Sequence, residues 1–177
     1  NQYYGIIKVA NSALESLDSY AANTTNDQLL SQYRSYCGEV RTLRAYAYYR
    51  LTQAFGDVTI LENNNQIDLT RSKKAAVEKY MLQDLQYAMD NSPKLRPNEM
   101  THYGAVTAYT AEMMAAKIYL NEGNYAMVEK LTSTSSSRFR ARSATSRSSS
   151  ANAPTSVRVP AIWSMPTTGS FSRVPAL

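Results

Sequence analysis

Few side chains in this sequence are of the types that carry out chemistry. His102 is the single histidine and Cys37 the single cysteine of 177 residues, so neither a multi-histidine metal site nor a disulfide can form within the chain. No G-x-S-x-G, Walker or H-E-x-x-H motif occurs. Asp57, Glu62 and Asp68 could flank a sugar, but glycosidase chemistry needs two carboxylates at a fixed separation, which sequence spacing does not establish. We therefore expect no catalytic residues, no metal site and no cofactor.

Side chains suited to binding are more plentiful. The fourteen tyrosines have amphipathic rings of the kind that stack on sugar faces. Several of them fall on helix stripes, where core packing is the simpler interpretation: Tyr33, Tyr80, Tyr109 and Tyr119. Arg41 and Arg44 share one helix face, and we interpret them as structural partners of carboxylates or helix-end carbonyls. Cys37 fits a small buried apolar position, and His102 lies in a polar loop, as an ordinary surface histidine does.

The net charge of +5 belongs to one end of the chain. Residues 1–132 hold 13 Lys and Arg against 14 Asp and Glu, whereas residues 133–177 hold six Arg and no Lys, Asp or Glu. The first 132 residues thus lack the basic footprint of a nucleic-acid-binding surface, and we expect no nucleic-acid partner. No apolar run approaches the 18 residues that suggest a membrane-spanning helix.

Helices must position these side chains, because apolar residues recur at steps of three and four in four segments. We expect helices at Tyr4–Leu17, at about Asp27–Phe55 after the turn- and cap-forming residues 23–27, from a cap at Ser72 to Asn91, and at about Val106–Asn121. Between the second and third, Val58–Leu61 indicates an extended excursion that leads into a long loop.

The fourth helix has two apolar stripes, which predicts packing on both sides. One stripe is Ala108, Ala111, Ala115 and Ile118, and the other is Tyr109, Met113, Ala116 and Leu120. Gly123 then makes a corner, Asn124 can cap, and residues 125–131 begin a fifth helix. This corner is similar to that of a tetratricopeptide hairpin, in which Gly permits the tight turn.

The composition changes abruptly after this point. Residues 133–177 contain 13 serines and six arginines in 45 residues, too little apolar surface to offset the entropy of ordering. A natural disordered tail and translation in a wrong reading frame are the two explanations. The second is favoured, because Lys, Asp and Glu all disappear where a helix has barely begun. We therefore divide the chain into a helical domain at 1–132 and a Ser/Arg-rich tail at 133–177.

Residues 38–61, GEVRTLRAYAYYRLTQAFGDVTIL, closely resemble the SusD/RagB family motif E-x-R-x-x-R-A-x-x-Y-F-x-L followed by a Y/F-G-D-V-P turn. The matching residues are Glu39, Arg41, Arg44, Ala45, Leu51, Phe55, Gly56, Asp57 and Val58. Upstream, Tyr4, Ile7, Ala10 and Asn11 fit the family's Y-x-x-I-x-x-A-N helix. Downstream, Asp84, Leu85 and Ala88 fit its D-L-x-x-A pattern, whereas Ala105 stands where its G-R-x-T stretch has Arg.

The resemblance spans residues 1–132 and implies an all-α fold of tetratricopeptide-like helical pairs with one long loop excursion. It implies a surface-exposed outer-membrane lipoprotein that binds glycans or peptides and serves a SusC-like TonB-dependent transporter. The chain starts at Asn1 rather than Met, so we expect its signal peptide and lipid-anchor cysteine to lie outside this sequence. Family members bind ligand just before the first matched helix, so Asn1 is the ligand-binding residue that we expect here.

Two other functions stay open at this stage. A tetratricopeptide-like scaffold would bind protein partners through loops and concave faces. An RNA-associated protein is the interpretation that the Arg/Ser tail alone would suggest. A lipoprotein signal peptide beside a transporter gene would favour the nutrient-binding function, whereas a cytosolic start codon would favour the scaffold.

Removal of residues 133–177 should change the free energy of unfolding of the remaining helices by less than about 0.5 kcal/mol, because the tail lacks the apolar residues of a core. Urea unfolding of the full and shortened chains measures the difference. Loss of the helices on removal would contradict the artefact explanation. The artefact explanation would also be contradicted if no reading frame of the DNA beyond Leu131 encoded a sequence with helical periodicity and ordinary Lys and Glu content.

Overall fold

The computed structural model describes residues 2–67, 69–100, 102, 104–133 and 136–137. Four α-helices are α1 (Gln2–Ala22), α2 (Asp27–Phe55), α3 (Lys74–Asn91) and α4 (Ala108–Asn121), with a 3-10 turn, η1 (Pro97–Glu99), before α4. Residues 125–133 are also helical. Among the described residues the only β-pairing is an isolated antiparallel bridge between Val58 and Ser72. The predicted all-α fold, with extended chain confined to the region after α2, is confirmed.

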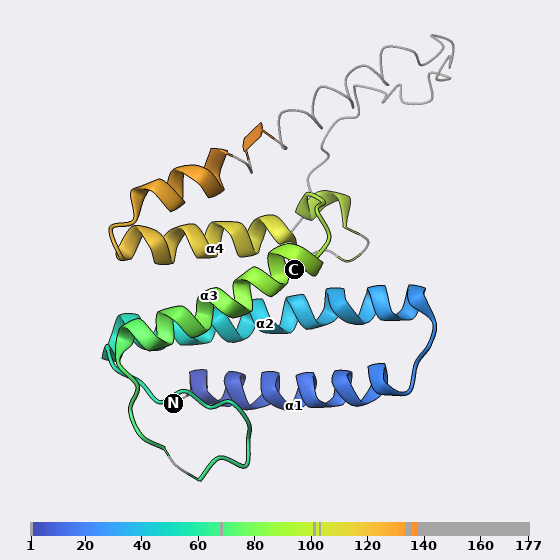
Figure 1. Cartoon of the computed structure of the whole chain (residues 1–177), viewed down its shortest axis with the longest axis horizontal. Helices are drawn as coiled ribbons and strands as arrows, with labels where there is room; N and C mark the ends of the chain where they lie inside the picture. Colours follow the sequence, from blue (N-terminus) through green and yellow to red (C-terminus); the bar gives the residue numbers. More distant parts are fainter. Residues whose placement is uncertain (1, 68, 101, 103, 134–135, 138–177) are drawn as a thin grey trace, which may run out of the picture. The chain divides into compact units, whose positions relative to one another are not determined.

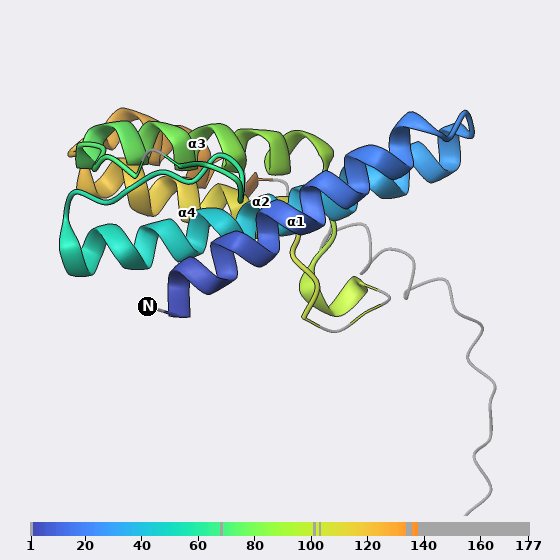
Figure 2. The ribbon, with the colours of Figure 1, turned by 90° about the horizontal axis from the view of Figure 1, so that it is seen from below.

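The helices pack in chain order as antiparallel neighbours (Figure 1). α1 lies along α2, α3 packs on another side of α2, and α4 packs mainly on α3. Viewed from below, α1 crosses α2 at a shallow angle, while α3 runs beside α2 and α4 lies behind them (Figure 2). Each helix covers the one before it, as in tetratricopeptide-like pairs. The predicted tail lies almost wholly outside the described residues, so the division at residue 132 stays a prediction.

The helix ends follow the turn and cap residues with one exception. The Asn26 side chain accepts hydrogen bonds from the backbone N–H of Gln28 at 2.9 Å and Leu29 at 3.4 Å, a regular N-cap. The prediction that Ser72 caps α3 is wrong: Lys73 is the N-cap residue and has no side-chain cap bond. Ser72 instead pairs with Val58, and Asp57 Oδ1 accepts the Lys74 N–H at 2.8 Å. A carboxylate from a distant turn therefore replaces the local cap.

The core forms where α1, α2, α3 and α4 meet the extended segment. Its largest fully buried side chains are Ile7, Tyr48, Leu51, Val77, Met81, Leu85 and Ile118. α3 comes close to α2 at Gly38, where an added Cβ would collide with the Ser92 hydroxyl and lie 3.4 Å from the Ala88 Cα. A residue without a side chain therefore suits this position, since a larger one would have to displace the Ser92 side chain. Cys37, next to it, is buried as predicted, and burial raises the pKa of its thiol.

α4 only partly fulfils the prediction of packing on two faces. The stripe Ala108, Ala111, Ala115 and Ile118 is buried. On the other stripe, Ala116 is buried, but Met113 and Leu120 are 51% and 52% exposed. The corner after α4 forms as expected, with Gly123 at φ 76° and the Asn124 side chain accepting the Met127 N–H at 3.3 Å. The prediction of full cover is thus wrong at Met113 and Leu120.

A buried polar network joins three helices and the loop. Arg44 on α2 donates from Nε and Nη2 to the two oxygens of Asp84 on α3, at 2.8 and 2.7 Å. Its Nη1 donates to Asn11 Oδ1 on α1 at 2.8 Å, and Asn11 Nδ2 donates to the Leu61 carbonyl at 3.0 Å. Arg44, Asp84 and Asn11 are all buried. A bidentate arginine–carboxylate pair of this kind sets the relative orientation of the two side chains and also pairs their charges.

Asp84→Ala should lower the free energy of unfolding by about 3–5 kcal/mol, because it leaves the Arg44 guanidinium in the core without its carboxylate. Urea unfolding followed by circular dichroism is the measurement. Asp90→Ala is the matched control, since Asp90 is an exposed α3 carboxylate bonded only to Gln86 among the described residues, and it should cost less than about 0.5 kcal/mol. Equal losses in the two variants would contradict the structural role of the network.

Candidate functional site

The loop between α2 and α3 forms one side of the candidate site. Gly56, at φ 70°, ends α2 with its N–H bonded to the Thr52 carbonyl at 3.0 Å. The chain then leaves the helix at Val58 and returns beside it at Ser72, whose N–H donates to the Val58 carbonyl at 3.0 Å. Residues 59–71 are therefore a closed loop with adjacent ends.

Two tyrosine hydroxyls hold the start of this loop. The Tyr4 hydroxyl on α1 accepts the Thr59 N–H at 3.0 Å and donates to the Thr59 carbonyl at 3.2 Å. The Tyr48 hydroxyl on α2 makes the same pair of contacts with Leu61, at 2.8 and 3.4 Å. Thr59 and Leu61 are alternate residues of extended chain, so the two hydroxyls act as a neighbouring strand would. Burial raises the pKa of the Tyr48 hydroxyl.

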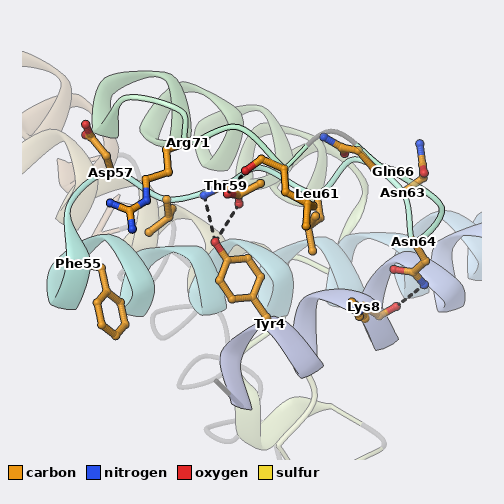
Figure 3. A pocket seen from close by; sticks show the side chains of 12 residues that line it. Tyr4, Lys8, Phe55, Asp57, Thr59, Leu61, Asn63, Asn64, Gln66 and Arg71 are labelled. Carbon is orange, nitrogen blue, oxygen red and sulfur yellow. Dashed lines mark hydrogen bonds between the residues drawn. The ribbon is translucent and has the colours of Figure 1, made fainter.

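Beside the held segment lies a cavity of about 610 Å³ between α1, the end of α2 and the loop (Figure 3). Its apolar lining is Tyr4, Phe55, Val58, Leu61 and Leu69. Its polar lining is Lys8, Asp57, Thr59, Asn63, Asn64, Gln66 and Arg71. Phe55 is 65% exposed, so its ring is available to a bound molecule. Aromatic surface with amide and charged groups around it is a lining that fits a polyhydroxylated ligand.

Several polar lining groups also shape the loop. Asn64 Nδ2 donates to the Lys8 carbonyl at 2.9 Å and to the Ser12 hydroxyl at 2.7 Å, which ties the loop to α1. Asn63 Oδ1 accepts the Asn65 N–H at 3.0 Å and Gln66 Oε1 accepts the Glu62 N–H at 3.1 Å. The loop is thus fixed by its own amides and by α1.

The residues singled out from the sequence fall in different places. Asn1 and Asp68 lie outside the described residues, so the assignment of Asn1 to ligand binding stays a prediction. Asp57 lines the cavity, whereas Glu62 lines a separate polar hollow together with Arg44 and Asp84. His102 is exposed.

The predicted structural role of the two arginines is confirmed. Arg44 forms the buried pair, and Arg41 adds an ion pair to Asp84 at 3.3 Å while its guanidinium lies 4.3 Å from the centre of the Tyr87 ring.

Sequence reasoning missed Phe55, Tyr4 and the amide side chains as members of one cavity. The run Asn63-Asn64-Asn65-Gln66 after an extended segment was the available signal, because consecutive amides supply both donors and acceptors. Nothing in the spacing indicated that α1 would meet this run, since the contact joins residues more than fifty positions apart.

A second hollow, of about 430 Å³, lies on the other side of α1 and is almost purely apolar. It is lined by Gln2, Gly5, Ile6, Val9, Ala10, Ala13, Val40 and Leu43. Val9 is 71% exposed. We call this hollow the apolar groove.

The described residues contain no group of three His, Cys, Asp or Glu side chains placed to hold a metal ion. None of their helices is both long enough and apolar enough to cross a membrane.

Comparison with known proteins decides the family. A SusD-like family described as "starch-binding associating with outer membrane" matches residues 1–120. The chain belongs to the SusD-like family. A SusD-like protein of Bacteroides ovatus is 25% identical over 124 residues, which are 67% of this chain and 21% of that protein. This SusD-like chain therefore spans about a fifth of the length of that relative.

Solved structures share the SusD-like fold. A SusD superfamily protein of Bacteroides vulgatus superposes with a TM-score of 0.64 at 21% identity, over 73% of this chain and 27% of that one. A laminarin-binding SusD-like protein superposes with a TM-score of 0.62 at 23% identity, again over 73% and 27%. Asn11, Arg44 and Asp84 of the buried network are among the residues that resemble the family motif.

Tyr48→Phe should speed hydrogen exchange of the Leu61 amide, and Tyr4→Phe that of the Thr59 amide, because each change removes the hydroxyl that accepts that N–H. A lost hydrogen bond of about 1–3 kcal/mol corresponds to roughly 5- to 150-fold faster exchange. Amide exchange followed by NMR resolves the two residues. Each variant serves as the other's control, and equal acceleration of both amides in either variant would contradict separate anchoring.

Proposed function

We propose that this chain is the cavity-bearing part of a surface protein that binds oligosaccharides without cleaving them. The observation that carries the proposal is the 610 Å³ cavity, which joins an exposed aromatic ring, Phe55, to amide side chains at 63, 64 and 66. Sugar rings present apolar faces and hydroxyl edges, so aromatic and amide groups together match both. Membership of a family described as starch-binding supports the same ligand class.

The proposed setting follows from the family. A protein "associating with outer membrane" would hold glycan at the cell surface, and a SusC-like TonB-dependent transporter is the partner that would receive it. Membrane association would come from a lipid anchor. A peptide ligand remains the alternative to a glycan in the same cavity.

A protein-binding scaffold is the second candidate, and the apolar groove is the observation that favours it. Ile6, Val9 and Leu43 are exposed there without charged neighbours in the lining, a composition more typical of the centre of a protein interface than of a sugar site. The two functions use different faces of α1, so one set of variants separates them.

Phe55→Ala should weaken binding of neutral oligosaccharides about three- to tenfold, because an aromatic contact of this kind contributes about 0.5–1.5 kcal/mol. Affinity electrophoresis in gels that contain starch, laminarin or xyloglucan is the measurement. Tyr46→Ala is the matched control: Tyr46 is also an α2 aromatic, 46% exposed, but it does not line the cavity, and its loss should change nothing.

Chromatography of the same glycans after long incubation should show no shorter products. Time-dependent cleavage by pure protein would remove the non-enzymatic part of the proposal. If no glycan is retarded by any variant, while Val9→Ser abolishes capture of a protein partner, the scaffold function replaces the glycan-binding one.

A further inference from the structure

Two cationic side chains at the cavity have no carboxylate partner among the described residues. Lys8 on α1 and Arg71 near the end of the loop both line it and are exposed. Neither makes an ion pair with a described residue, although four other cations do so: Arg41, Arg44, Lys74 and Arg96. The cavity thus has two cationic groups whose charges the described residues leave unmatched.

The carboxylate of the described lining is already committed elsewhere. Asp57 Oδ1 accepts the Lys74 N–H at 2.8 Å at the first residue of α3. A helix N-terminus carries partial positive charge, which offsets that of the carboxylate. Asp57 also forms no ion pair with Lys8 or Arg71, so the described lining holds two cations and one carboxylate and keeps a cationic excess.

The two cations are separated along the cavity. Arg71 and Lys8 lie on opposite sides of Tyr4, and the Arg71 guanidinium is directed toward the cavity between Phe55 and Thr59 (Figure 3). A ligand with one acidic group would meet one cation. A chain that repeats an acidic group from unit to unit could meet both while its rings lie against Tyr4 and Phe55.

We propose that the preferred ligand of this cavity is an acidic oligosaccharide, with carboxylate or sulfate groups on successive sugars. This inference rests on the proposed glycan-binding function and narrows its ligand class. Arg71 offers a planar fork that matches an acidic group with two oxygens, and Lys8 offers a compact point charge on a flexible stem. Both are solvent-exposed, so their contribution is sensitive to salt.

The test is isothermal titration calorimetry of the full 177-residue chain with hexagalacturonate and with its uncharged methyl ester. A sulfated carrageenan hexasaccharide is a third probe, which distinguishes the two acidic groups. An acidic probe should bind about five- to twentyfold more tightly than the ester at low salt, since each exposed charge pair contributes about a two- to fivefold effect. The preference should shrink as salt is raised.

The double variant Lys8→Gln and Arg71→Gln should bring the affinity for the acidic probe down to that for the ester. The control variant Lys79→Gln and Lys117→Gln removes the same charge from exposed helix positions that do not line the cavity, and it should keep the preference. Circular dichroism checks that both variants are folded.

Equal affinity for acid and ester would overturn the acidic preference and leave the glycan-binding function standing. No binding of any sugar would overturn both. Tighter binding of a hexaglutamate peptide than of either acidic sugar would also overturn the inference, since the cations would then serve a peptide.

Discussion

The pairing of Arg44 with Asp84 is the interaction on which the rest of this structure depends. It joins α2 to α3 with two short hydrogen bonds inside the core, and the remaining Arg44 nitrogen reaches Asn11 on α1. A buried ion pair contributes little net stability by itself, because desolvation opposes the attraction between the charges. Its effect here is geometric, since only one relative placement of three helices lets all these groups find partners.

The same network reaches the candidate site through Asn11. Its amide donates to the Leu61 carbonyl, and the Tyr48 hydroxyl contacts both polar backbone groups of the same residue. Leu61 is thereby fixed to α1 and α2 together, two residues beyond the Tyr4 contact at Thr59. The inner wall of the cavity is therefore hydrogen-bonded to two core helices, whereas its polar rim belongs to a loop. Such a division suits a binding site that must present several hydrogen-bonding groups without losing its shape.

The helices could be predicted because their apolar spacing depends on local sequence, and the predicted span of the second, Asp27–Phe55, agrees with that of α2. The structural role of Arg41 and Arg44 could also be predicted from their shared face. The start of α3 was predicted wrongly with a cap at Ser72, because Asp57 supplies the bond from seventeen residues away. The cavity could not be predicted from the sequence for the same reason. Tyr4, Lys8 and the loop meet only after α1 has packed on α2, and no local pattern encodes that contact.

α1 connects the two candidate binding faces and shows why they suit different partners. Ile7, Ala10 and Leu14 enter the core, Tyr4 and Lys8 line the cavity, and Ile6, Val9 and Ala13 line the apolar groove. A sugar brings hydroxyls that lose water on binding, so it needs the donors and acceptors that only the cavity side supplies. The apolar groove offers almost none and would leave those hydroxyls unsatisfied. Apolar side chains of a protein surface carry no such penalty, so the cavity side of α1 suits a glycan and the other side suits a protein contact.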